Sequence, residues 1–173
     1  MLIELSKYKN MVIGALDEGA LVGRVKVALV DPDHGKIIGF LVKEKGLFGP
    51  SKVVSILDVI DVEKRAMVIN SRASLVDKNE IVRIAKILKF KFNLLGLPAR
   101  TKDGQMLGRI TDAVINSQTG EIIRVYTQFL MQRRVFERSK IEEITWQEIL
   151  LSTDDRKRVK SKLTVSKEAE SAA

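Results

Sequence analysis

Apolar and polar residues alternate along much of this chain, which is the pattern of β-strands with one buried face. In the segment 24–29, every second residue is a valine or a leucine. Residues 31–35 follow as an expected turn, because Pro32 and the neighbouring aspartates favour turn angles and Gly35 accepts a positive φ. A nearly continuous apolar strand is then expected over 37–42. The pattern predicts a mainly β protein.

The same scheme occurs twice in the chain. Residues 18–42 align without a gap on residues 103–127, at an offset of 85 positions, and seven positions are identical. After a contraction of three residues, the match resumes between 54–62 and 136–144. Two copies are too few for a solenoid, which needs about three to bury a continuous face. We therefore expect two tandem, small, antiparallel β-barrels, because closure of a barrel removes exposed strand edges.

One helix is predicted between the two copies. Asp77 is a suitable N-cap with Glu80 at the third helical position, which is a variant of the capping box. Four apolar residues then follow at helical spacing, namely Ile81, Ile84, Ala85 and Leu88. The expected organisation is a first barrel over 1–73, a linker helix over 74–90, a second barrel over 91–151 and a basic tail over 152–173. The tail lacks the apolar residues for a core, so we expect it to be flexible or a short helix.

The composition excludes several classes of protein. The chain has 173 residues, 45% of them hydrophobic, and a net charge of +8, so wholesale disorder is excluded. There is no cysteine and a single histidine, His34, which excludes disulfides, thiol chemistry and Cys- or His-rich metal sites. No uncharged run approaches the roughly twenty residues of a membrane-spanning helix. The first ten residues lack the cationic start and the apolar block of a secretory signal. We expect a soluble cytoplasmic protein without a cofactor or metal.

The second copy carries motifs that resemble the PRC-barrel domain family. They are LGLP at 95–98, TKDG at 101–104, LGRITDAVI at 107–115 and TGEI at 119–122. This family includes the barrels of the photosynthetic reaction centre H subunit and of the ribosome-maturation factor RimM. The first copy fits more loosely, since Val27 stands where the second copy has Asp112. The resemblance covers roughly 8–70 and 91–151, and it implies a barrel fold and a docking role, with no shared catalytic residues to carry over.

A group of basic and aromatic residues in the second copy is the best nucleic-acid candidate. It comprises Arg133, Arg134, Arg138 and Lys140 with Phe129 and Phe136. Arginine side chains form bidentate hydrogen bonds with phosphates, and aromatic rings stack on bases. The alternative is a solvated loop with Phe136 in the core, and we favour this alternative.

Three further features each allow two interpretations. Arg156, Lys157 and Arg158 in the tail are candidate contacts to RNA or to an anionic membrane surface, or they belong to a plain soluble tail. Phe48 is a candidate partner contact, although a structural contact within its barrel is favoured. His34 follows Asp31 and Asp33, so an acid–base pair is conceivable, but a solvated turn histidine is the favoured interpretation.

These observations lead to one main functional hypothesis and one alternative. The first is a non-catalytic binding or adaptor protein whose barrels hold a protein partner or self-associate. The alternative is an RNA- or ribosome-associated factor that uses the basic second copy and the tail. An enzyme is not expected, because nucleophile, base and metal ligands do not occur as a recognisable set.

Overall fold

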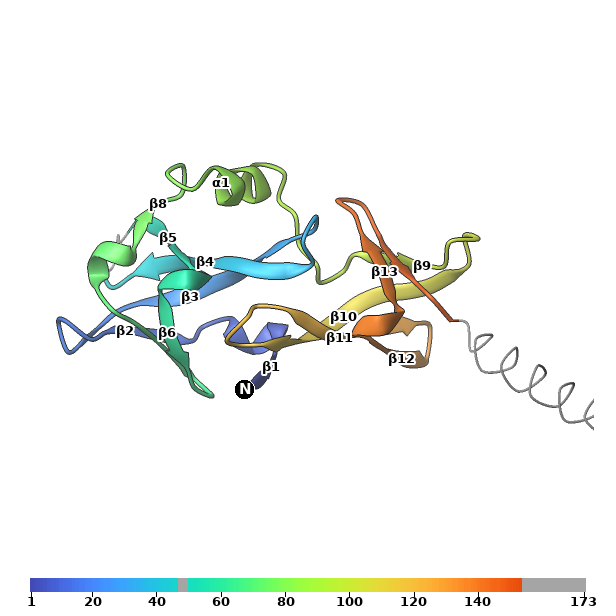
Figure 1. The fold of residues 1–173 in the computed structure, drawn as a ribbon, viewed down its shortest axis with the longest axis horizontal. Coiled ribbons are helices and arrows are strands. Elements are labelled where there is room, and N and C mark those ends of the chain that lie inside the picture. The colour runs from blue at the N-terminus through green and yellow to red at the C-terminus, as the bar shows by residue number, and fades with distance from the viewer. Residues whose placement is uncertain (47–49, 154–173) are drawn as a thin grey trace, which may run out of the picture.

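The computed structural model describes residues 1–46 and 50–153. This part of the chain is mainly β and forms two curled sheets and one α-helix (Figure 1). The two sheets lie side by side along the long axis of the molecule, and the helix lies over the first sheet. The prediction of a mainly β protein is therefore confirmed, whereas the assignment of the two sheets to PRC-type barrels stays a prediction.

Within the described residues, the first sheet has the strand order β6-β7-β2-β3-β4-β5-β8. All neighbours are antiparallel except β2 and β7, which are parallel. The strands are β2 (Val12–Ala15), β3 (Ala20–Asp31), β4 (Lys36–Glu44), β5 (Ser51–Ser55), β6 (Val59–Val62), β7 (Ala66–Ile69) and β8 (Val76–Asp77).

The second sheet has the order β12-β11-β10-β9-β14-β13. The N-terminal strand β1 also pairs with β10, so the start of the chain belongs to the sheet of the second repeat. The parallel pair here is β9 with β14. The strands are β1 (Leu2–Glu4), β9 (Pro98–Arg100), β10 (Met106–Asn116), β11 (Ile122–Phe129), β12 (Gln132–Glu137), β13 (Ile141–Ile144) and β14 (Ile149–Leu151).

The sequence repeat folds into a structural repeat. Strands β2 to β7 and β9 to β14 follow the same order, with the parallel pair in the same place. Short 3-10 turns occupy equivalent positions after the fourth strand of each set, at η2 (Ile56–Asp58) and η4 (Arg138–Lys140). Gly35 and Gly120 close equivalent turns with φ of 60° and 75°, which explains why both copies have glycine there.

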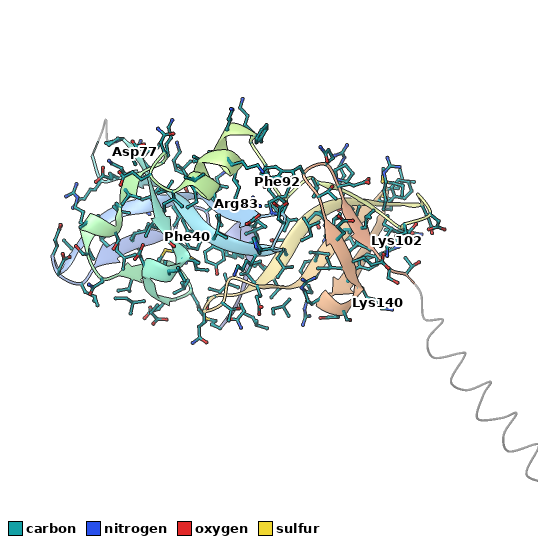
Figure 2. The ribbon with its side chains drawn as sticks, turned by 45° about the horizontal axis from the view of Figure 1, so that its top comes forward. Phe40, Asp77, Arg83, Phe92, Lys102 and Lys140 are labelled. Carbon is teal, nitrogen blue, oxygen red and sulfur yellow. The ribbon has the colours of Figure 1, made fainter. Side chains whose placement is uncertain are left out.

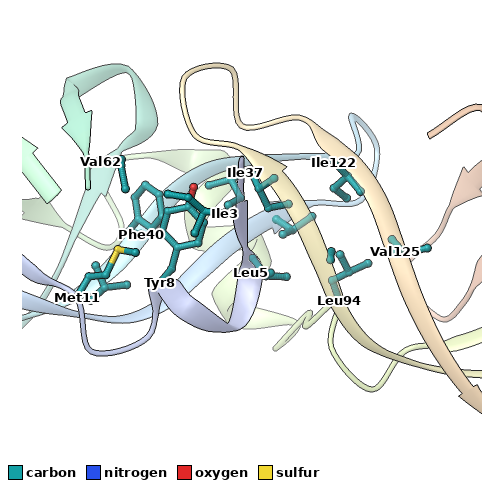
Figure 3. Close-up of a cluster of buried hydrophobic side chains, with 14 of the residues drawn as sticks. Ile3, Leu5, Tyr8, Met11, Ile37, Phe40, Val62, Leu94, Ile122 and Val125 are labelled. Carbon is teal, nitrogen blue, oxygen red and sulfur yellow. The ribbon is translucent and has the colours of Figure 1, made fainter. Parts of the chain in front are cut away.

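One cluster of buried side chains runs through both sheets. The 3-10 turn η1 (Leu5–Tyr8) places Tyr8 against Phe40 of β4, with ring centroids 5.2 Å apart. From there the cluster continues through Ile37 to Ile122 and Val125 of β11 (Figure 3). Because the cluster contains residues from both repeats, the two sheets bury apolar surface against each other and are stabilised together.

Helix α1 (Val82–Lys89) packs on the outer face of the first sheet, where Ile84 and Ile87 meet Leu29 and Val53. The predicted start of the helix at Asp77 is wrong. The capping-box contact does form, since Glu80 Oε1 accepts the backbone N–H of Asp77 at 2.9 Å. However, Asp77 is held in β8 by pairing with β5, so this contact closes a turn and the helix begins only at Val82.

Candidate functional site

The hairpin of β11 and β12 carries the first two predicted contact residues, Arg133 and Arg134. Its tip consists of Leu130 and Met131, which are 78% and 96% exposed. Leu130 adopts φ of 52°, a left-handed conformation that costs a non-glycine residue roughly 1–2 kcal/mol. The hairpin therefore presents apolar side chains next to basic ones.

The two arginines do not lie on one surface. Successive side chains of a strand point to opposite faces, so Arg133 shares a face with Val135, and Arg134 shares the other face with Phe136. Arg133 is exposed, whereas Arg134 is half-buried and donates to Gln132 Oε1 at 3.1 Å. Phe136 is buried, as favoured from the sequence, and is not available to stack on a base.

Arg138 and Lys140 lie away from the hairpin tip, in η4. Arg138 lines a cavity of about 370 Å³ between the two repeats, together with Asp33, His34, Glu142 and Glu143. Its Nη1 donates to the carbonyl of Ile141 at 3.5 Å. The structure thus separates Arg138 from Arg133. The other predicted contacts, at Phe48, Arg156, Lys157 and Arg158, lie outside the described residues.

The outer face of β11 and β12, the open face, differs from its counterpart in the first repeat. We define the open face by Arg124, Tyr126, Gln128, Arg133, Val135 and Glu137, which pair across the two strands. Val135 is equivalent to Val53, and Tyr126 is equivalent to Leu41, in the same strand register. Val53 is fully buried under α1, but Val135 is 53% exposed. No described residue covers the second face as α1 covers the first.

One substitution between the repeats bears on how closely a helix approaches this face. Gly39 of β4 lies directly under α1, and a Cβ added to it would lie 2.7 Å from Cδ1 of Ile84. The equivalent residue in β11 is Arg124, whose Nε lies 3.6 Å from Glu137 Oε1. The absence of a side chain at position 39 lets the helix approach the first sheet. On the second sheet, a long arginine side chain stands at this position, next to Tyr126 on the same face.

The outer edge of the second sheet, formed by β12, is also uncovered within the described part of the chain, unlike the equivalent edge of the first sheet. In the first repeat, β8 pairs with the outer edge of β5, so that Asp77 lies opposite Lys52 and Val76 opposite Val53. The equivalent edge belongs to β12, and no described strand pairs with it. A free edge offers backbone N–H and C=O groups to another strand. The open face and this edge together form one continuous exposed surface.

A second surface, around α1, was not found from the sequence. We define it as the basic–aromatic face, made of Lys78, Lys86, Lys89, Phe90, Lys91 and Trp146. The Trp146 ring lies 5.6 Å from the Phe90 ring and 5.6 Å from the Phe92 ring, edge to face in both cases. Lys86 Nζ lies 5.1 Å from the centroid of the Trp146 ring. The lysines are visible in the sequence, but the approach of Trp146 from the β13–β14 turn is a tertiary contact.

A cluster of charged residues fixes α1 on the first sheet. Arg83 Nε donates to Asp31 Oδ2 at 2.9 Å, and its Nη2 pairs with both Asp31 and Asp33. His34 Nδ1 lies 2.7 Å from Asp31 Oδ2, so the structure does bring the histidine to a buried carboxylate. Figure 2 shows Arg83 and Phe92 where α1 approaches the second sheet.

The electrostatics of Asp31 follow from this cluster. Burial of the carboxyl acts to raise its pKa, but hydrogen bonds from Arg83 and His34 outweigh it, so the pKa of Asp31 lies below its ordinary value. The pKa of Arg83 is raised by the same contacts. Asp31 and Arg83 therefore stay charged at neutral pH and anchor the helix. Within residues 1–46 and 50–153, no three His, Cys, Asp or Glu side chains are grouped so as to hold a metal ion.

Comparison with protein-family models finds no match for this chain, and comparison with curated proteins finds none either. The relation to the PRC-barrel family therefore rests on the sequence motifs and stays a prediction. In the part of the chain that the structure describes, no helix is long and apolar enough to cross a membrane.

Proposed function

We propose that this protein is a non-catalytic binding protein, an adaptor, that docks a segment of a partner protein on the open face and the free edge of β12. One observation carries the proposal. At equivalent positions of the two repeats, Val53 is paired with β8 at the sheet edge and buried beneath α1, whereas Val135 is 53% exposed and no described residue covers it. The first repeat thus serves as an internal example of what this surface binds.

The side chains of the open face support a protein ligand of defined chemistry. Tyrosine and arginine are enriched among residues that dominate binding energy at interfaces, and Tyr126, Arg124 and Arg133 lie together here. In the first repeat, Asp77 of the added strand lies opposite Lys52. Arg134 is equivalent to Lys52. The matching ligand is therefore an antiparallel strand with an acidic residue opposite Arg134 and an apolar residue opposite Val135.

The charge on β12 favours a different protein over a second copy of this chain. Antiparallel pairing of two β12 strands would place four arginines, Arg133 and Arg134 of each copy, on one short stretch with only two glutamates, the Glu137 of each copy. Like charges on facing strands are destabilising. An acidic partner meets the same arginines favourably.

RNA association through the second repeat has less support. That alternative requires Arg133, Arg134, Arg138 and Lys140 to act as one surface. Arg133 and Arg134 point to opposite faces of β12, and Arg138 lies in the cavity between the repeats. The two aromatic residues are also divided, since Phe129 is 42% exposed and Phe136 is buried.

Site-specific photo-crosslinking in the full-length chain tests the proposal. A photo-reactive amino acid is placed at position 135, and at position 57 as the control, because Leu57 is 91% exposed in the first repeat. After irradiation in the protein's own cells, adducts are identified by mass spectrometry. The adducted protein is then purified, and its binding to wild type, Tyr126→Ala and Leu57→Ala is measured by calorimetry.

We expect an adduct at position 135 that is missing at position 57. Tyr126→Ala should weaken binding of the purified partner at least tenfold, and Leu57→Ala should leave it unchanged. Equal adducts at both positions would overturn the proposal. So would an adduct only with a second copy of the chain, or only with the chain's own residues 154–173.

A further inference from the structure

The segment around α1 concentrates positive charge that no described residue neutralises. Residues 78–91 contain five basic side chains and one acidic side chain. Arg83 is paired with Asp31 and Asp33. The four remaining basic residues are exposed and form no ion pair with a described residue, namely Lys78, Lys86, Lys89 and Lys91. The ammonium groups of Lys86 and Lys89 lie 5.1 Å and 5.9 Å from the centroids of the Trp146 and Phe90 rings, and none of the four is paired with a described carboxylate.

Aromatic rings lie among these lysines. Phe90 caps the C-terminus of α1 and is 61% exposed, and its ring meets Trp146 edge to face at an interplanar angle of 68°. The Trp146 ring also meets the Phe92 ring edge to face. The Phe90 ring is therefore held in place by Trp146 and still exposed, so a flat ligand can stack on it.

A groove of about 560 Å³ runs beside the rings. Lys78, Lys86 and Lys89 line it, together with Asn79, Ala85, Leu88 and Phe90. Cationic side chains therefore surround an apolar floor, and Phe90 belongs to both the groove and the aromatic cluster. The volume lies in the range of sites that bind small organic ligands. A flat ring with attached phosphates matches this combination of chemistry.

We propose that the basic–aromatic face binds single-stranded nucleic acid, with the lysines on successive phosphates and a base stacked on Phe90. A single strand is required because only an unpaired base is free to stack on a protein ring. The inference goes beyond the proposed adaptor function, since it concerns other residues and another ligand. Either can therefore fail without the other.

The orientation of α1 disfavours a membrane surface as the ligand. A helix that lies in a membrane interface inserts its apolar face between the lipids. The apolar face of α1 is already buried, because Ile84 and Ile87 pack on Leu29 and Val53 of the first sheet. The solvent side offers lysines, the Phe90 ring and a single exposed valine, Val82, and this combination suits phosphates and bases.

Fluorescence titration of the full chain tests the inference directly. Trp146 is the single tryptophan of the protein, so its emission reports on this face alone. The probes are twelve-residue oligo(U) and oligo(dT), titrated at several salt concentrations, and the anisotropy of labelled oligonucleotide is followed in parallel. Oligo(U) and oligo(dT) separate RNA from DNA as the source of the strand. Vesicles of anionic phospholipid and a poly-glutamate peptide are the competing ligands.

The variants separate charge from stacking. Lys86→Glu with Lys89→Glu should weaken oligonucleotide binding at least tenfold and flatten its salt dependence, whose wild-type slope in log K against log salt is expected at about −2 to −3. Phe90→Ala should weaken binding roughly tenfold and leave the salt slope unchanged, because it removes a stacked ring and no charge. Lys7→Glu with Lys9→Glu reverses two exposed lysines elsewhere and should have no such effect.

Several outcomes would overturn the inference. Binding that survives both α1 variants but is lost with Lys160→Glu and Lys162→Glu would place the nucleic-acid contact in the tail. Binding of vesicles or of poly-glutamate, but of neither oligonucleotide, would assign the face to another ligand class. Circular dichroism and melting temperature of each variant verify that loss of binding is not loss of fold.

Discussion

Lys36 and Glu121 are equivalent residues of the two repeats, 85 positions apart, and they pair with each other as an isolated antiparallel bridge. Two backbone hydrogen bonds flank this bridge, from the N–H of Ile37 to the carbonyl of Gly120 at 2.8 Å, and from the N–H of Ile122 to the carbonyl of Gly35 at 3.4 Å. Ile37 is equivalent to Ile122 and Gly35 to Gly120, so replacing each residue by its equivalent turns one hydrogen bond into the other. Such a reciprocal contact is the mark of two-fold symmetry, and the repeats therefore meet on a pseudo-two-fold axis at the bridge.

The two repeats therefore contact each other as the subunits of a symmetric dimer do, with the same patch on both sides. The shared core follows from this arrangement, because Ile37 and Ile122 lie next to the axis and are both fully buried. The candidate surfaces are not repeated across this axis. The first repeat carries α1 on its outer face, while the second carries the open face.

The glycines of the two turns provide a matched pair for testing the axis. Both have a positive φ, so alanine costs roughly 1–2 kcal/mol at either position. A Cβ at Gly120 would also lie 2.5 Å from the carbonyl oxygen of Ile37, whereas a Cβ at Gly35 has its nearest neighbour at 3.5 Å. We expect Gly120→Ala to cost on the order of 3 kcal/mol and Gly35→Ala clearly less, by urea unfolding. Equal losses would show that the contact across the axis is not tight.

A buried hydroxyl in the second repeat offers a stabilising substitution. Thr127 is fully buried, and its Oγ1 has no hydrogen-bond partner among the described residues. The equivalent residue of the first repeat is Val42, which is also fully buried. Thr127→Val should raise the free energy of unfolding by about 1 kcal/mol, since it removes an unsatisfied polar group at constant shape. The reciprocal control, Val42→Thr, should lower it; a loss of stability in Thr127→Val would contradict the prediction.

The charged anchor of α1 predicts a pH-dependent contribution to stability. Asp31→Asn removes the charge that pairs with Arg83, so we expect a loss of about 2–3 kcal/mol at pH 7. The pKa of Asp31 is lowered in the folded state, so the contribution is fully present above its ordinary value of 3.8 and is lost progressively as the pH falls from there through the lowered pKa of the folded state. Urea unfolding of both proteins between pH 7 and pH 3 measures this. Asp33→Asn is the control, because Asp33 is half exposed; a difference that keeps the same size from pH 7 to pH 3 would contradict the assignment.

Local patterns in the sequence predicted the strands, because alternation and turn residues act over a few positions. The repeat then predicted that equivalent strands recur, as the order of β2–β7 and β9–β14 shows. The start of the helix was missed because the pairing of β8 with β5 overrides the capping signal at Asp77. The addition of β1 to β10 was also missed, since three residues carry no signal for their partner strand.

The candidate surfaces depended on contacts that the sequence does not encode locally. Arg133 and Arg134 were visible as a basic pair, but their separation onto two faces follows from the strand register. The openness of Val135 is apparent only by comparison with Val53, which requires knowledge of where α1 packs. Trp146 reaches Phe90 from a turn more than fifty residues further along the chain. Tertiary packing therefore decides which residues form each surface.

The hydroxyl of Tyr8 makes the stability of the protein sensitive to alkaline pH. Tyr8 is 1% exposed, and its hydroxyl has no hydrogen-bond partner among the described residues. Burial raises the pKa of Tyr8 from 10.0 to about 12. The folded state thus holds this proton more tightly than the unfolded chain, so stability falls as the pH rises from about 10 to about 12.

Tyr8→Phe should remove this dependence and keep the contact of the ring with Phe40. At pH 7 we expect the variant to be as stable as wild type or up to about 1–2 kcal/mol more stable, because an unsatisfied hydroxyl leaves the core. Between pH 10 and pH 12, the wild type should lose stability relative to the variant in urea unfolding. Tyr126→Phe controls for the loss of a hydroxyl on the open face. Parallel curves for wild type and Tyr8→Phe over this range would show that the buried hydroxyl is not the titrating group.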